Sequence, residues 1–97
     1  MEHSIENGVL TIYLEGNLSS SNSEEVEEEI NALLASSDFE SIRIDMDKLI
    51  YMSSAGVRIV ITVKQRYDDT AVVNVPPDVY EVFDMVGLPE IMRIEPK

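Results

Sequence analysis

The chain has 97 residues, is 44% hydrophobic and carries a formal net charge of −12, which predicts one domain over residues 1–97 with one core. The absence of cysteine excludes disulfides and thiolate metal sites, and the absence of a signal segment or long apolar run predicts a cytoplasmic protein without membrane contact. The first 42 residues contain ten acids and no Lys or Arg, so we expect no nucleic-acid partner.

The first element predicted in chain order is a half-buried strand at residues 9–15, where apolar and polar residues alternate and Gly16 ends the run. A further strand is possible at residues 4–6. Residues 17–23 read as a loop. Ser21 followed by Glu24 predicts a capping box, and a stripe at helical spacing then predicts a helix with a solvated acidic face at residues 24–29; the stripe is Val26, Ile30, Leu33 and Leu34.

A second strand is indicated by the alternation of Ile42, Ile44 and Met46 with charged residues, and it leads toward a serine pair. Residues 57–63 are ambiguous, because five of the seven are Val or Ile and favour a strand. Small residues before this segment and cations after it are typical of a helix, so we expect a helix.

Residues 71–75 form a short, nearly continuous apolar run that predicts a strand covered on both faces, and two prolines stop it. A last helix follows, with Gly87 as its C-terminal cap and the stripe Val79, Val82, Phe83 and Val86. Residues 91–94 are expected as an edge strand. The order β, α, β, α, β, α, β, with the possible extra strand near the N-terminus, predicts an α/β domain with a mixed sheet and helices packed against it.

The serine pair Ser53 and Ser54 is the principal candidate site, because it stands at the first turn of the predicted second helix. Unpaired N–H groups and the macrodipole favour an anion there, although the serines could also serve only as a helix cap. Few other residues suggest a catalytic or binding role. His3 is a lone histidine near the terminus, and Asp45 with Asp47 supplies too few ligands for a cation. The Ser-Ser-Ala-Gly turn lacks a nucleophile elbow and a histidine partner, so no enzyme, metal or cofactor is expected.

Three segments in order resemble the STAS domain, and in particular the stand-alone bacterial anti-sigma factor antagonists: EGNLSSSNSEEVEEEINALL, SIRIDMDKLIYMSSAGVRIVI and VVNVPPDVYEVFDMVGLPEIMRI. The resemblance covers nearly the whole chain. It implies a binding module that sequesters a serine-kinase anti-sigma factor with a histidine-kinase-like ATPase fold, until phosphorylation of one serine ends the binding. A PP2C-type phosphatase resets the cycle.

Aligned on Gly56, the resemblance implies that Ser54 is the phosphorylated serine, with Ser53 as a second choice. It also implies a partner surface, which comprises Ser19, Asp45, Ser53, Ser54, Ala55, Gly56, Val57 and Arg58. Ser53 and Ser19 both replace acids that are common near this serine in the family. The alternative is a STAS interaction subunit of a transporter or sensory complex that is not phosphorylated.

Overall fold

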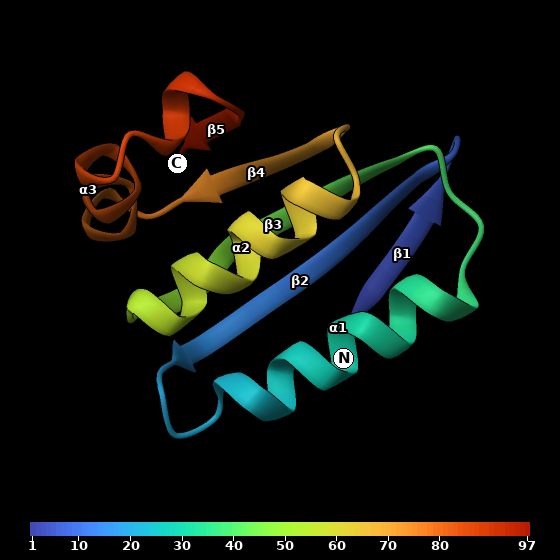
Figure 1. Ribbon diagram of the computed structural model, residues 1–97, viewed down its shortest axis with the longest axis horizontal. Helices are drawn as coiled ribbons and strands as arrows, with labels where there is room; N and C mark the ends of the chain where they lie inside the picture. The colour runs from blue at the N-terminus through green and yellow to red at the C-terminus, as the bar shows by residue number, and fades with distance from the viewer.

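The computed structural model describes all of residues 1–97 and contains five strands, three α-helices and one 3₁₀ helix. The elements are β1 His3–Glu6, β2 Val9–Leu18, α1 Ser23–Ser36, β3 Ser41–Met52, α2 Ser54–Arg66, β4 Thr70–Val75, α3 Pro77–Met85, η1 Leu88–Glu90 and β5 Arg93–Pro96. The strands form one sheet in the order β1-β2-β3-β4-β5 (Figure 1). β1 is antiparallel to β2 and all other pairs are parallel, so the predicted mixed α/β sheet is confirmed.

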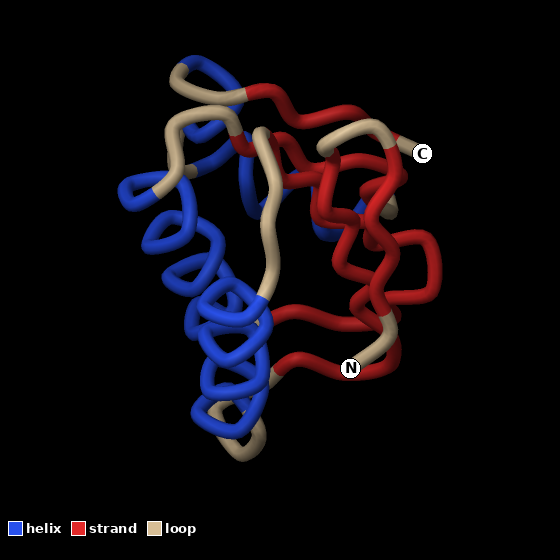
Figure 2. The backbone as a smooth tube through the Cα atoms, turned by 90° about the vertical axis from the view of Figure 1, so that its right-hand side faces the viewer, coloured by secondary structure: helices blue, strands red, loops and turns tan.

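Helices lie on one face of the sheet (Figure 2), and α1 and α2 both lie on that face (Figure 1). The core is formed by buried side chains of the strands and helices. Alternate residues of the central strands point into it, and Leu10, Ile12, Ile42, Ile44 and Val72 are all at most 2% exposed. Burying a Val, Leu or Ile side chain contributes roughly 1.5–3 kcal/mol, so this strand alternation fixes which face the helices cover.

Two strand predictions need correction. β2 does not end at Gly16 but continues to Leu18, because Gly16 adopts φ +73° beside a shift of register against β3 and so forms an irregularity within the strand. β4 is not covered on both faces: Ala71 and Val73 are only partly buried and alternate with the buried Val72. Neither α1 nor α2 covers the sheet face on which Ala71 and Val73 lie.

The start of α1 also differs from the prediction. The N-cap is Asn22, and its side chain makes no capping bond to the helix. Ser21 turns away, with its Oγ 2.8 Å from the Oγ of Ser19, so the predicted capping box with Glu24 is wrong. The apolar stripe is confirmed, since Ile30 and Leu34 are buried and the other two members pack against the core.

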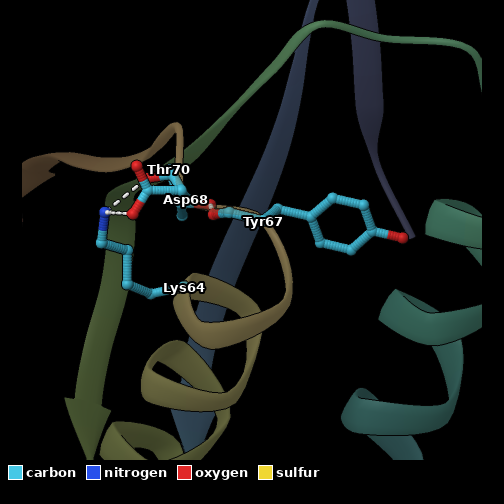
Figure 3. Close-up of polar contacts among 4 residues, drawn as sticks. All are labelled: Lys64, Tyr67, Asp68 and Thr70. Carbon is cyan, nitrogen blue, oxygen red and sulfur yellow. Dashed lines mark hydrogen bonds and ion pairs between the residues drawn. The ribbon is translucent and has the colours of Figure 1, made fainter.

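The ambiguous Val- and Ile-rich segment is the helix α2, as predicted. Its branched residues form a buried face, and this tertiary burial outweighs their strand propensity; the face comprises Val57, Ile59, Val60 and Val63. The turn to β4 is held by polar contacts at the end of α2 (Figure 3). Lys64 Nζ lies 3.1 Å from Asp68 Oδ1, and Thr70 Oγ1 donates to the Tyr67 carbonyl at 2.5 Å.

The C-terminal part follows the prediction except at Val86 and at the last strand, which was predicted at residues 91–94 and lies at Arg93–Pro96, after the short 3₁₀ helix Leu88–Glu90. Val79 and Phe83 are buried, but Val86 is 58% exposed, because α3 ends at Met85 and Val86 lies in the turn that follows it. Gly87 adopts the left-handed φ +75° that ends the helix, and β5 forms the sheet edge from Arg93. No helix combines the length and hydrophobicity that crossing a membrane requires.

Candidate functional site

The serine pair lies at the carboxyl edge of the sheet, where β2 and β3 end side by side. Leu18 is paired with Met52 in the parallel register, and the N–H of Ser53 donates to the Leu18 carbonyl at 2.9 Å. The start of α2 therefore lies directly beside the loop from β2 to α1, although 34 residues separate Leu18 from Met52 in the chain. This edge brings together residues that the sequence could relate only through the resemblance.

Ser53 and Ser54 have different roles. Ser53 is the N-cap of α2: its Oγ accepts from the N–H of Ala55 at 3.2 Å, and its carbonyl accepts from Gly56 at 3.0 Å and Val57 at 3.3 Å. Ser54 is the first helical residue, is exposed and makes no side-chain hydrogen bond. The capping role belongs to Ser53, and Ser54 presents a free hydroxyl to solvent.

Gly56 fixes the first turn of α2 against the strand ends. A Cβ at this position would lie 2.4 Å from Cγ of Met52 and 2.9 Å from Cδ2 of Leu18. Real Cβ atoms do not approach other atoms so closely, so only glycine allows the helix to sit here unshifted. Gly56 and the adjacent Val57 are both buried, and their predicted place on the partner surface is corrected to a supporting one beneath it.

Ser19 lies at the same edge, in the first turn after β2. Its N–H donates to Oδ1 of Asn22 at 2.9 Å, and the Asn22 amide in turn donates to the Asn17 carbonyl at 2.7 Å. These bonds fold the loop over itself, and the Ser53 bond to Leu18 holds it next to α2. Ser19, the residue after Leu18, therefore lies near Ser53, and their shared place on a partner surface stays a prediction.

Asp45 lies away from this edge, because β3 continues for seven residues beyond it to Met52. Asp45 pairs with Tyr13, five residues before the end of β2, so it lies roughly 17 Å along the sheet from the serine edge. Its carboxylate accepts from the Asn74 amide at 3.0 Å and from the Asp47 N–H at 2.9 Å. The structure therefore does not bring Asp45 next to Ser54, since the strand is longer than its alternating part suggested, and its place on a partner surface stays a prediction.

Two apolar residues at this edge were missed in the sequence. Ile50 is 77% exposed and Tyr51 is 52% exposed, and they immediately precede the serine pair at the end of β3. The available signal was the apolar run from Leu49 to Met52, which breaks the alternation of the strand. Exposed large apolar side chains next to a free hydroxyl are typical of a protein contact rather than a catalytic centre.

The cation closest in sequence to Ser54 is Arg58, one helical turn further along α2. Its side chain is 61% exposed, and its guanidinium lies 3.7 Å from the carboxylate of Glu27 on α1. His3, the single histidine, lies on β1 and bonds the Met1 carbonyl. No three acids or histidines gather as a metal site. The edge therefore offers a hydroxyl, apolar surface and one cation, a set suited to binding.

Comparison with known proteins agrees with this geometry. A family model described as the STAS domain matches residues 1–97. An anti-sigma F factor antagonist of Paenibacillus polymyxa is 31% identical, with 97% of this chain and 82% of that protein covered.

Two solved structures have the same fold. A crystal structure of an anti-sigma factor antagonist from Mycobacterium paratuberculosis has a TM-score of 0.88 at 19% identity and covers 99% of this chain and 84% of that one. The Bacillus cell fate determinant SpoIIAA in its phosphorylated form has a TM-score of 0.71 at 21% identity and covers 96% and 88%.

Proposed function

This chain belongs to the STAS domain family, and from that premise we propose that it is an anti-sigma factor antagonist whose binding is ended by phosphorylation of Ser54. The partner is an anti-sigma factor that is itself a serine kinase, and a PP2C-type phosphatase removes the phosphate. The observation that carries the proposal is the free, exposed hydroxyl of Ser54 on the rigidly held first turn of α2.

The physical basis of the switch is electrostatic. A phosphate on Ser54 adds about −1.5 to −2 charges and three acceptor oxygens to a surface that was neutral at this point. A partner that covers the unmodified hydroxyl has to desolvate this charge on binding. Each 1.4 kcal/mol changes affinity about tenfold, so a penalty of a few kcal/mol ends binding without a change of fold.

The proposed contact surface consists of the exposed and half-buried residues around Ser54 at this edge. Ile50 and Tyr51 supply apolar area, the Ser19–Ser21 turn supplies hydroxyls, and Ala55 and Arg58 continue the surface along α2. Tyr and Arg are enriched among residues that dominate interface energies. The adjacent face of α1 is acidic, so the matching surface of the kinase should be basic.

The test is a calorimetric titration of the purified kinase with Ser54→Ala and Ser54→Asp variants. We expect Ser54→Ala to bind like the unchanged protein and Ser54→Asp to bind at least tenfold more weakly. Ser36→Asp is the matched control, because it adds the same charge at the exposed end of α1. Equal affinity of both Ser54 variants would instead support an unphosphorylated interaction subunit of a transporter or sensory complex.

A second measurement tests the acceptor directly. The kinase and ATP are incubated with the protein, and intact-protein mass spectrometry is used to detect added phosphate. We expect one phosphate on the unchanged protein and none on Ser54→Ala, whereas modification that persists in Ser54→Ala and disappears in Ser53→Ala would assign the acceptor to Ser53.

A further inference from the structure

We propose that Arg58 pairs with the phosphate once Ser54 is phosphorylated, and that it leaves Glu27 on α1 to do so. This inference rests on the proposed function, because it concerns the phosphorylated state of the same site. It assigns to one exposed arginine the role of a positioning residue for the phosphate. It also makes the Arg58–Glu27 ion pair between α2 and α1 dependent on phosphorylation.

The geometry supports this exchange. Ser54 and Arg58 are separated by four residues in one helix, so their side chains lie on the same face with Cβ atoms about 5–6 Å apart. An acidic group N-terminal to a basic one at this spacing is the favourable orientation. The planar guanidinium can donate two parallel hydrogen bonds to a phosphate.

The present partner of Arg58 holds it only loosely. The 3.7 Å separation from Glu27 is longer than the 2.7–2.9 Å of a charge-assisted hydrogen bond, and the arginine side chain is 61% exposed. A phosphate one turn away carries about twice the charge of the carboxylate. It also lies at the N-terminus of α2, where the macrodipole favours an anion. Arg58 should therefore pair with the phosphate in preference to the Glu27 carboxylate.

The remaining groups around Ser54 do not oppose the exchange. The neighbouring residues of the edge, Ser53 and Ser19, are serines at positions where carboxylates would repel the phosphate. Arg66, the other arginine of α2, is twelve residues away, about 18 Å along the axis, and donates to Asn31 at 2.9 Å. Arg58 is therefore the arginine of this helix within reach of the phosphate.

The experiment uses the full chain with phosphoserine inserted at position 54 during translation, so no kinase is needed. The second pKa of the phosphate, about 6 in the free amino acid, is measured by ³¹P NMR titration. We expect Arg58→Gln to raise this pKa by about 0.3 unit, because the cation that favours the dianion is lost. Glu27→Gln should lower it, because a competitor and a negative charge are removed.

Arg66→Gln is the matched control and should leave the phosphate pKa unchanged, and the effect of Arg58→Gln should shrink in 1 M salt. Equal pKa values in the Arg58→Gln and Arg66→Gln proteins would overturn the inference. Circular dichroism confirms that each variant is folded. Because the phosphate is placed without the kinase, failure here is distinct from failure of the proposed switch, which the kinase titration tests.

Discussion

Substitution of Gly56 by alanine tests whether the first turn of α2 is held as tightly as the structure indicates. Gly56 is buried, and the added methyl would lie 2.4 Å from Cγ of Met52, a mid-chain atom of a residue that is only 4% exposed. The second contact, at 2.9 Å, is to a terminal methyl of Leu18. Relief of both contacts requires α2 or the two strand ends to move.

The expected magnitude follows from two opposing effects. Replacing glycine by alanine in a helix stabilises it by about 1 kcal/mol. Overpacking a closed site by one methyl costs about 1–3 kcal/mol. The two together predict that Gly56→Ala lowers the free energy of unfolding by about 1 kcal/mol.

The assay is urea unfolding followed by circular dichroism, with the change in midpoint converted through a common m-value. The background variant Met52→Ala supplies a control, since it removes the nearest clashing side chain. In that background we expect Gly56→Ala to be neutral or stabilising, a coupling of about 1–2 kcal/mol between the two sites. A stabilisation of about 1 kcal/mol by Gly56→Ala alone would refute the reasoning, because it would mean that space exists above the strands.

Three further predictions concern single side chains. Ser53→Ala should lower the free energy of unfolding by about 1 kcal/mol in urea, whereas Ser53→Asp keeps the cap; equal losses would contradict the capping role. Tyr51→Ser should weaken kinase binding at least tenfold by calorimetry while stability changes by less than about 0.5 kcal/mol, and unchanged affinity would remove Tyr51 from the surface. Asn74 adopts φ +55°, so thermal melts should find Asn74→Ala about 1 kcal/mol less stable than Asn74→Gly, and equal stability would show that no backbone strain is stored there.

The sequence predicted the elements well wherever a periodic pattern decided burial. The stripe from Val26 to Leu34, the strand alternation around Ile44 and the helix at residues 57–63 were all read correctly, because each pattern repeats over several residues. Predictions failed at element ends. β2 passes through Gly16, and Val86 lies beyond the buried part of α3, since a single residue carries too little signal to locate an end.

For the candidate site, the serine pair and its place at a helix start could be read from the sequence. The division of roles could not: the Ser53 side chain caps the helix by accepting from the Ala55 N–H, and Ser54 begins the helix with its side chain free. Ile50 and Tyr51 were missed because an apolar run in a strand normally indicates burial. The distance of Asp45 from Ser54 could not be predicted, because the length of β3 depends on its pairing with β2.

The sequence by itself determined the element types, the covered face of the sheet and the position of the Ser54 hydroxyl at a helix start. These features depend on residues that are close together in the sequence. The tertiary structure alone decided which residues share the carboxyl edge. That edge depends on strand register, on the close approach at Gly56 and on the contact of α2 with Glu27. Such contacts join residues far apart in the chain, and their geometry is fixed only when the core packs.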